Sequence, residues 1–340
     1  MAKQTYAQQP SPEHFFETIN AYQQTASLKA ALELDLFTVV GEGNQTAPAI
    51  AKRCGASERG TRILCDYLVV IGFLTKEGHQ YGLTADSAMF LDRRSPGCVA
   101  GAVTFLTSPH LTDGFKDLAA AVRKGGTVVG EAGTLVPEHP VWVEFARAMA
   151  GFMALPAELI ARLVGAAEGK KWKVLDIAAG HGLFGIAIAK HNPNAEIVAV
   201  DWPGVLAVAQ ENARAAGVAA RFRTSPGSAF EVDFGGGYDL VLLTNFLHHF
   251  DAPTCEKFLR KVHAALGDGG QAVTFEFIPN EDRVSPPVAA KFSLIMLSST
   301  PSGDAYTFSE YERMFRNAGF QSSELHPLPP TPGQVVLSYR

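Results

Sequence analysis

The amino-acid sequence predicts an α/β protein with a Rossmann-like, seven-stranded sheet in its C-terminal half and a mostly helical, winged-helix-like domain at its N-terminus. Three observations lead to this fold class. A strand, glycine turn, helix and second strand follow one another over residues 173–202. Further apolar strand patterns alternate with helical ones up to the C-terminus, and helix-period patterns fill the first half. At 340 residues, the chain is long enough for two domains.

Composition and charge exclude several classes of protein. Hydrophobic residues make up 47% of the chain and charged residues 19%, which is enough apolar surface for a sizeable core. The net charge of −5 argues against a nucleic-acid coat. Residues 1–18 lack the apolar segment of a signal peptide, and no apolar run is long enough to span a membrane. The four cysteines lie far apart without a C-x-x-C pair, so we expect no metal site and a cytoplasmic protein.

Residues 13–40 have the pattern of a helix with more apolar surface than a single amphipathic stripe needs. A helical segment this apolar must be covered by another surface, and a second copy of the chain is a plausible cover. We therefore expect a homodimer formed through the N-terminal domain. The apolar side chains at the start of the segment are Phe15, Phe16, Ile19 and Tyr22.

A helix–turn–helix pattern followed by a short hairpin comes next. Residues 47–54 and 58–72 read as two helices, and the hairpin turns at Glu77-Gly78. This outline is that of a winged helix, so a DNA-binding regulator is one interpretation. However, the second helix carries acidic residues beside Arg59 and Arg62, and the rest of it is apolar. Because a DNA reader needs a basic face, the charges favour a packing role and no nucleic-acid partner.

The segment 98–168 reads as a mainly helical linker that could form a lid over a substrate, broken by a loop at residues 124–130. Its last part, residues 141–164, carries a long stripe of aromatic and methionine side chains, for which core packing is the simplest interpretation. Phe152 and Met153 precede the first strand of the sheet and could instead cover a bound ligand.

The glycine turn indicates which nucleotide the sheet would bind. Gly180, Gly182 and Gly185 match G-x-G-x-x-G, and Asp201 ends the next strand, where a ribose-binding acid is expected. Asp176 stands inside the first strand, where its carboxylate would repel the pyrophosphate of NAD(P) but would suit an ammonium group. S-adenosylmethionine has an ammonium group, a ribose diol and no phosphate. The stretch therefore favours S-adenosylmethionine over a dinucleotide, and a turn without a ligand would leave both carboxylates unexplained.

Two adjacent histidines follow the next buried strand of the predicted sheet. His248 and His249 come directly after residues 238–244, and ligands of open α/β sheets bind at the carboxyl ends of strands. An ordinary helix start with solvated histidines is the alternative. The strand after Asp201 and those toward the C-terminus are expected at residues 220–224, 238–244, 271–277 and 334–339, with one more near residue 280 and the last one at the edge.

Six segments together resemble a known family. They are VLDIAAGHG, VAVDWPGV, GSAF, YDLVLLTNFLHHFD, LGDGGQAVTFEFIPNE and YTFSEYERMFRNAGF. The chain resembles the class I S-adenosylmethionine-dependent methyltransferases, and more narrowly the plant-type and hydroxyindole-type O-methyltransferases with their bacterial relatives in natural-product biosynthesis. The resemblance implies a winged-helix-like dimerisation domain at 1–97, a helical linker at 98–168 and a methyltransferase domain at 169–340. It also implies S-adenosylmethionine as cofactor and S-adenosylhomocysteine as product.

The resemblance assigns cofactor-binding positions residue by residue. Ser228 stands where many members carry an acidic residue near the adenine amine, and Thr244 stands where the family has a lysine. Trp202 replaces an apolar residue that packs on adenine. The full set implied for the cofactor is Asp176, Gly180, Gly182, Asp201, Trp202, Ser228, Ala229, Phe230, Thr244 and Asn245.

The resemblance also implies a catalytic pair. His248 matches the family's catalytic histidine, followed by His249 where an aspartate is usual. Glu276 matches the first of two glutamates that orient the histidine, whereas the second falls on Ala305, next to Asp304. A histidine with a pKa of about 6.5 can accept the proton of a phenol at neutral pH. We therefore expect His248 to deprotonate a hydroxyl group while Glu276 holds its ring.

The acceptor is expected to be a small aromatic or polyketide-like molecule. His249, Phe292 and Met296 would line its site, although a core helix explains Phe292 and Met296 equally well. Two other activities stay open, the first because it would use the same scaffold and the second because the second glutamate is missing. One is C-methylation of a tetrapyrrole or aromatic carbon, and the other is a descendant that binds S-adenosylmethionine without methylating. The sequence does not indicate whether residues 298–306 form a closing lid.

Overall fold

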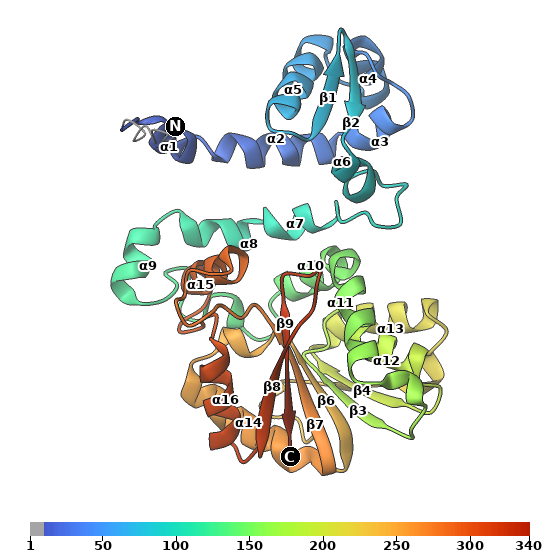
Figure 1. The fold of residues 1–340 in the computed structure, drawn as a ribbon, viewed down its shortest axis with the longest axis vertical. Helices are drawn as coiled ribbons and strands as arrows, with labels where there is room; N and C mark the ends of the chain where they lie inside the picture. Colours follow the sequence, from blue (N-terminus) through green and yellow to red (C-terminus); the bar gives the residue numbers. More distant parts are fainter. Residues whose placement is uncertain (1–9) are drawn as a thin grey trace, which may run out of the picture. The chain divides into compact units, whose positions relative to one another are not determined.

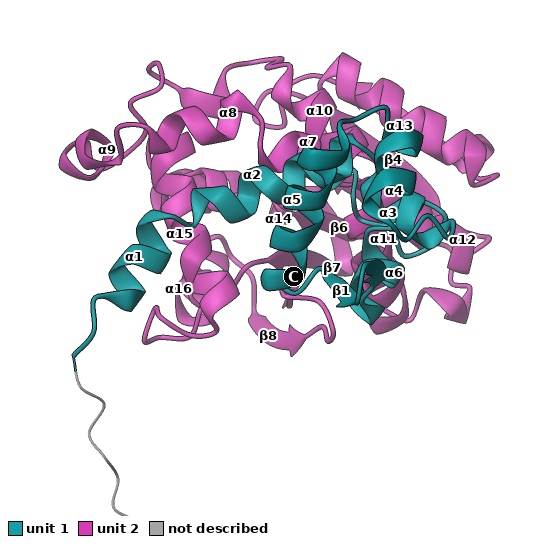
Figure 2. Cartoon of the chain, turned by 90° about the horizontal axis from the view of Figure 1, so that it is seen from above, with its two compact units in different colours: residues 1–103 teal, residues 104–340 magenta. Residues whose placement is uncertain are grey.

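The computed structural model describes residues 10–340, and the chain forms two compact units, residues 1–103 and 104–340 (Figures 1 and 2). The segment expected as a separate linker, residues 98–168, therefore lies almost entirely in the second unit, together with the sheet. Within the described residues, no helix is both long and apolar enough to cross a membrane.

The first unit has the expected winged-helix outline. The helix pair α4 and α5 is followed by the antiparallel hairpin β1–β2, as the sequence predicts. The apolar segment 13–40 is also helical, but it forms three helices, because Asp35 adopts a left-handed conformation (φ 54°) between the second and third. The elements are α1 (Glu13–Ile19), α2 (Tyr22–Glu33), α3 (Leu36–Gly41), α4 (Ala47–Cys54), α5 (Glu58–Val70), β1 (Leu74–Glu77), β2 (Gln80–Leu83) and α6 (Ala85–Phe90).

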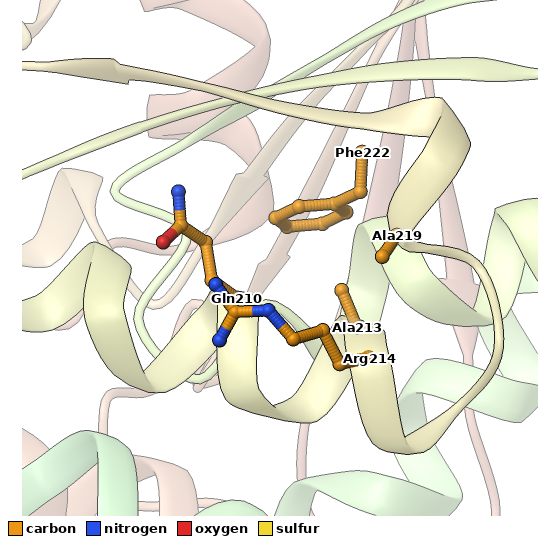
Figure 3. A pocket seen from close by; sticks show the side chains of 5 residues that line it. All are labelled: Gln210, Ala213, Arg214, Ala219 and Phe222. Carbon is orange, nitrogen blue, oxygen red and sulfur yellow. The ribbon is translucent and has the colours of Figure 1, made fainter.

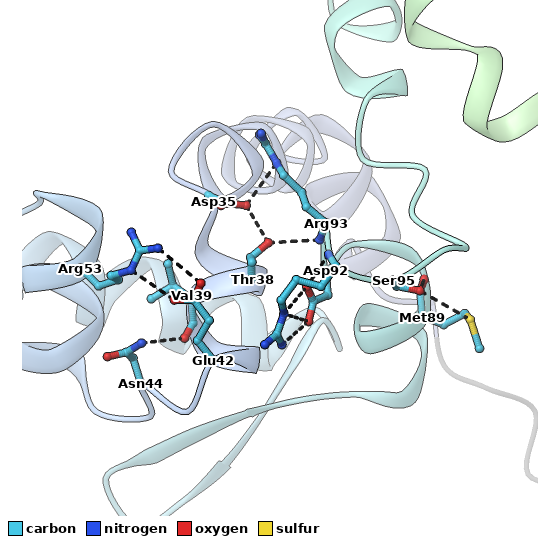
Figure 4. Close-up of polar contacts among 11 residues, drawn as sticks. Asp35, Thr38, Val39, Glu42, Asn44, Arg53, Met89, Asp92, Arg93 and Ser95 are labelled. Carbon is cyan, nitrogen blue, oxygen red and sulfur yellow. Dashed lines mark hydrogen bonds and ion pairs between the residues drawn. The ribbon is translucent and has the colours of Figure 1, made fainter. Parts of the chain in front are cut away.

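Polar contacts join the helices of this unit to the segment that follows the hairpin (Figure 4). Arg93 forms an ion pair with Asp35 at 3.1 Å, and the Thr38 hydroxyl donates to the same carboxylate at 2.7 Å. Arg53 pairs with Glu42 at 3.2 Å. The first helix, in contrast, has no buried residue, and Phe15, Phe16, Ile19 and Tyr22 are between 56 and 67% exposed.

The second unit begins with helices and continues into the sheet. The pattern at 141–164 is expected as one long run, but it forms two helices that meet at Met149. The helices are α7 (Ala102–Leu106), which crosses the unit boundary, α8 (Pro109–Thr112), α9 (Leu118–Lys124), α10 (Val141–Ala148), α11 (Ala150–Leu163), α12 (Leu183–His191), α13 (Pro203–Ala215), α14 (Ala252–Ala265), α15 (Pro287–Ser299) and α16 (Phe308–Asn317).

Seven strands form the sheet in the order β5-β4-β3-β6-β7-β9-β8, with β5 to β7 parallel and β9 and β8 antiparallel. The expected number of strands is confirmed, but the strand expected near residue 280 is wrong. The seventh strand is β8, whose residues alternate between exposed and half-buried because it forms the edge, so it shows no apolar run. The last strand, β9, lies inside the sheet. The bounds are β3 (Lys173–Ile177), β4 (Glu196–Asp201), β5 (Phe222–Pro226), β6 (Tyr238–Thr244), β7 (Leu266–Glu276), β8 (Ser322–Pro327) and β9 (Gln334–Tyr339).

Helices cover both faces of the sheet (Figure 1). Leu175 and Val241, from the two central strands, pack in one buried cluster with Phe258 of α14 and Phe315 of α16. On the other face, Asp176 contacts the start of α12. The strand order reverses direction between β3 and β6, and such a switch point opens a crevice at the carboxyl ends of the strands. The site should therefore lie where β3, β4, β6 and β7 end.

Candidate active site

The glycine turn leaves β3 with a backbone that few side chains could follow. Gly180 and Gly182 have φ angles of 57° and 75°, in the left-handed region. A Cβ on Gly182 would lie 2.9 Å from Ala209 of α13 and 3.1 Å from the ring of Phe222 on β5. Packing thus requires glycine at this position. The turn delivers backbone N–H groups and the start of α12 to the carboxyl end of the sheet.

Asp176 is fully buried beneath this turn. Its Oδ2 accepts a hydrogen bond from the N–H of Gly185 at 3.0 Å, while its Oδ1 has no partner among the described residues. Burial raises the pKa of this carboxyl to about 8, and the neighbouring Asp201 adds to the shift. Without a ligand, the side chain is therefore mostly neutral at pH 7. A cation beside Oδ1 would favour its ionised form.

Asp201, at the end of β4, ties the turn to the next strand. Its carboxylate accepts hydrogen bonds from the N–H of Gly180 at 2.8 Å and of Trp202 at 2.7 Å. Burial raises its pKa to about 6, so it is ionised at neutral pH. A carboxylate has about four acceptor positions, so two remain for hydroxyl groups. The Trp202 ring packs against the start of α13 and against α10.

The loop after β5 lies beside Asp201, because the N–H of Gly227 donates to the Asp201 carbonyl at 2.9 Å. The hydroxyl of Ser228 accepts from the N–H of Phe230 at 3.3 Å, and Lys261 donates to the Ala229 carbonyl at 2.9 Å. The loop that carries Ser228, Ala229 and Phe230 thus begins beside the end of β4, next to Asp201. At one position of this loop, Ser228, many members of the family that the sequence resembles carry an acidic residue.

A pocket of about 170 Å³ lies between α13 and the start of β5, lined by Gln210, Ala213, Arg214, Ala219 and Phe222 (Figure 3). None of its residues is a predicted site residue. The Phe222 ring, which forms a wall of the pocket, also lies against Gly182 of the glycine turn.

Two residues at the turn were missed by the sequence analysis. His181 is buried between the rings of Phe145 and Phe184, at centroid distances of 6.3 and 5.7 Å. Its Nδ1 accepts from the N–H of Leu183, and burial lowers its pKa to about 4, so the ring is neutral. Phe145 belongs to α10, which therefore covers the turn. A histidine between two glycines is an unusual residue for a tight turn, and this pattern could have identified His181 from the sequence.

The end of β6 carries the next group of predicted residues. Thr244 is buried, and Asn245 adopts a left-handed conformation with its N–H donating to the Phe275 carbonyl at 2.8 Å. The Asn245 side chain contacts the sulfur of Met153 at 3.8 Å. The structure thus brings buried Met153 of α11 to the end of β6. Its neighbour Phe152 is only partly buried.

His248 and Glu276 form a buried pair at the ends of β6 and β7. His248 Nδ1 is hydrogen-bonded to Glu276 Oε2, and the two residues are 4% and 1% exposed. The other carboxylate oxygen accepts from the N–H groups of Phe246 and Leu247, at 2.9 and 3.0 Å. Because an ionised carboxylate only accepts, we assign the Nδ1 proton to this bond. Nε2 of His248 is then free to accept a proton.

The surroundings of His248 are mostly aromatic. The ring of Phe292, from α15, meets it edge to face at 4.8 Å, and Phe277 stacks on Phe292 at 4.5 Å. Met296 of the same helix is buried. Asp304 does not substitute for the missing second glutamate, because its side chain is 41% exposed and pairs with Arg283 at 3.4 Å. Glu276 is therefore the carboxylate that orients the imidazole.

Comparison with known proteins gives two matches to family models. An O-methyltransferase domain matches residues 115–321, and an O-methyltransferase dimerisation domain matches residues 16–93. The 3-hydroxy-5-methyl-1-naphthoate 3-O-methyltransferase of Streptomyces sahachiroi is 29% identical over 302 residues, covering 87% of this chain and 86% of that protein.

Solved structures agree with these matches. A candidate O-methyltransferase from Nostoc punctiforme is 60% identical, with a TM-score of 0.94 over 97% of this chain and 99% of the other. Human N-acetylserotonin methyltransferase in complex with S-adenosylmethionine is 21% identical, and its fold matches with a TM-score of 0.83 over 98% of this chain and 99% of the other.

Proposed function

This chain belongs to the O-methyltransferase family and is an S-adenosylmethionine-dependent O-methyltransferase, and we propose that it methylates a hydroxyl group of a small aromatic or polyketide-like molecule with His248 as general base. The observation that carries the proposal is the buried pair of His248 and Glu276 at the switch point of the sheet. A solvated histidine at the start of a helix would need no buried carboxylate partner.

The residues at the glycine turn fit the cofactor. Asp176 offers a buried, unpartnered oxygen to an ammonium group, and Asp201 has acceptor positions left for the two ribose hydroxyls. Gly180 and Gly182 let the backbone approach the methionine part closely. When bound, S-adenosylmethionine supplies a methyl group that its sulfonium has already activated. The protein therefore has to align the acceptor oxygen and remove its proton.

The proposed transfer needs one proton acceptor. Nε2 of His248 would take the proton of the acceptor hydroxyl as its oxygen receives the methyl group, with S-adenosylhomocysteine as the leaving product. Glu276 stabilises the resulting imidazolium and keeps the ring in one orientation. Phe292 provides an apolar wall beside this histidine, and Met296 is buried one helical turn further along the same helix, which supports an aromatic acceptor.

The central prediction concerns His248. Replacing it with Gln removes the base, so we expect kcat for release of S-adenosylhomocysteine to fall at least about 100-fold, the size of a general-base contribution. Affinity for S-adenosylhomocysteine, measured by calorimetry, should stay within about twofold, because the glycine turn is untouched. A His248→Gln enzyme with wild-type turnover would remove His248 from the reaction. Locating the new methyl group by NMR separates O- from C-methylation, and absence of S-adenosylhomocysteine release would indicate a non-methylating protein.

The first unit supports pairing of chains rather than DNA binding. In the second helix of the winged-helix outline, Arg62 pairs with Asp66, and Lys76 of β1 pairs with the same carboxylate. These cations are therefore partly neutralised, whereas a DNA reader keeps its cations free for phosphates. The exposed apolar side chains of α1 support a homodimer interface.

A further inference from the structure

His249 has a buried polar atom for which the protein offers no partner. Its Nδ1 is inaccessible to solvent and has no hydrogen bond among the described residues. The rings around it are those of Trp142 at 5.2 Å, His248 at 4.2 Å and Phe250 at 6.2 Å. An unpaired buried polar atom destabilises the fold, so a ligand that pairs with it is one reason for keeping it.

The charge state of His249 limits what such a ligand can be. Burial, together with the adjacent His248, holds its pKa well below the usual range. The ring is therefore neutral at pH 7, with one nitrogen that donates and one that accepts. A neutral imidazole among aromatic rings suits an uncharged hydroxyl or carbonyl group better than a carboxylate or an ammonium group.

The surroundings of the two histidines are tied to the end of α15. Nε1 of Trp142, whose ring packs on His249, donates to the Thr134 carbonyl at 3.1 Å, and the Thr134 hydroxyl donates to the Ser299 carbonyl at 3.2 Å. Beyond the end of α15, Gly303 lies so close to the backbone of His248 that a Cβ there would be 2.3 Å from its carbonyl oxygen. These contacts tie Trp142 and the backbone of His248 to the segment around the end of α15.

We propose that His249 positions the acceptor by hydrogen-bonding a second oxygen of the same molecule. This oxygen would be ortho to the methylated hydroxyl, on the adjacent ring carbon, or peri to it, on the facing carbon of a fused ring. The inference rests on the proposed function, because it needs the first hydroxyl at His248. Adjacent imidazoles can reach two oxygens of one ligand only if those oxygens are themselves neighbours. Acceptors with ortho or peri oxygen pairs are then favoured over acceptors with a lone hydroxyl.

The test compares two probes that differ by one hydroxyl group, 1-naphthol and 1,8-dihydroxynaphthalene, with release of S-adenosylhomocysteine as the readout. In the wild-type enzyme we expect kcat/KM to be about tenfold or more higher for the diol, beyond the factor of two for its two equivalent hydroxyls. His249→Phe keeps the ring but removes both nitrogens, so the preference should disappear through loss on the diol alone. His249→Asn returns a polar group near the position of Nδ1 and should restore part of the preference for the diol.

Each other outcome overturns the inference. Equal use of both acceptors by the wild type, or an unchanged preference in His249→Phe, removes His249 from acceptor positioning while the proposed O-methyl transfer stands. A fall in kcat/KM that is equal for both acceptors in His249→Phe also removes His249 from acceptor positioning. If the wild-type enzyme methylates neither probe, the acceptor class is wrong and the inference fails with it. Calorimetry with S-adenosylhomocysteine then shows separately whether the proposed cofactor site survives.

Thermal unfolding without ligand distinguishes a positioning role from a structural one. Because His249→Phe removes an unpaired buried nitrogen and keeps the contact with Trp142, its Tm should equal or exceed that of the wild type. A Tm lower by several degrees would mean that the imidazole stabilises the fold, and would count against the inference.

Discussion

At the scale of single residues, the site keeps several polar atoms buried in arrangements that do not favour the empty protein. Asp176 has an unpaired oxygen and a pKa of about 8, and His249 has an unpaired nitrogen. A carboxyl group that folding makes harder to ionise destabilises the fold once the solution pH favours ionisation. The cofactor's ammonium group would remove this cost, so cofactor binding and stability should be linked through Asp176.

This linkage predicts a pH effect on stability. The folded pKa of Asp176 lies above its ordinary value of 3.8, so the folded state binds more protons than the unfolded state between these values. The free energy of unfolding should therefore fall as pH rises from about 5 to 8, by an amount on the order of a few kcal/mol, and Asp176→Asn should lack this part. Denaturant unfolding of both proteins without cofactor measures the difference.

Adding the cofactor gives a second test of whether Asp176 titrates in this range. S-adenosylmethionine should flatten the pH dependence of the wild type, because a neighbouring cation lowers the pKa of the carboxyl. Parallel stability curves for wild type and Asp176→Asn over this pH range would show that Asp176 does not titrate there.

Part of the site could be predicted from sequence because its residues directly follow strands. Asp201, His248 and Glu276 stand at strand ends, and parallel strands end along one edge. Phe145 and Trp142 could not be found in this way. They belong to α10, and the side of the sheet on which a helix packs depends on tertiary contacts that periodicity does not encode.

At the scale of elements, the end of α15 is held by close backbone contacts. Three glycines approach carbonyls at or just beyond its end so closely that a Cβ would lie 2.1–2.3 Å from an oxygen: Gly114 at Ser298, Gly133 at Ser299 and Gly126 at Pro301. The N–H of Thr127 also donates to the Thr300 carbonyl at 2.8 Å. Residues 298–300 are buried, so this part of the segment 298–306, for which the sequence left a closing lid open, is a packed support for the wall beside His248.

Gly126→Ala should therefore impair catalysis from outside the site. The new methyl group has to displace Pro301, and the segment that follows it lies against His248, so we expect kcat to fall about tenfold or more. The free energy of unfolding should fall by roughly 1–3 kcal/mol, as for other overpacked positions. Steady-state kinetics and denaturant unfolding measure the two effects.

Gly236→Ala is the matched control, because Gly236 also lacks a left-handed backbone and an added Cβ would have its nearest neighbour 4.0 Å away. Its kcat and stability should stay near those of the wild type. If Gly126→Ala behaves in the same way as this control, the support does not hold the catalytic histidine.

Element prediction failed where burial was partial or where a junction interrupted a pattern. The edge strand β8 is only half buried, so its residues Ser322–Pro327 give no apolar run. The helical pattern over 141–164 continues through Met149, where the structure separates α10 from α11. The buried strands β3, β4 and β6, in contrast, are found within one residue of the predicted ends, because both of their faces are covered and their apolar runs are continuous.

At the scale of the whole molecule, the two units carry different groups of predicted residues. All predicted cofactor, catalytic and acceptor residues lie within residues 104–340, and the match to a dimerisation domain lies within residues 1–103. Within the first unit, a groove of about 530 Å³ is lined by residues of α1, α2 and the end of α5, among them Phe16, Tyr67 and Val70. Exposed aromatic and aliphatic side chains next to a groove are typical of a surface that another chain covers.

A homodimer through this surface gives a prediction that is independent of the chemistry. Phe16→Glu combined with Ile19→Glu places two charges on the exposed face of α1, where burial against a second chain would become unfavourable. We expect sedimentation equilibrium to show a dimer for the wild type and a monomer for this variant. Val284→Glu changes an equally exposed apolar residue in the second unit and should leave the dimer intact. Because the cofactor residues are all in the second unit, the monomer should still bind S-adenosylhomocysteine, and a variant that remains dimeric would exclude α1 from the interface.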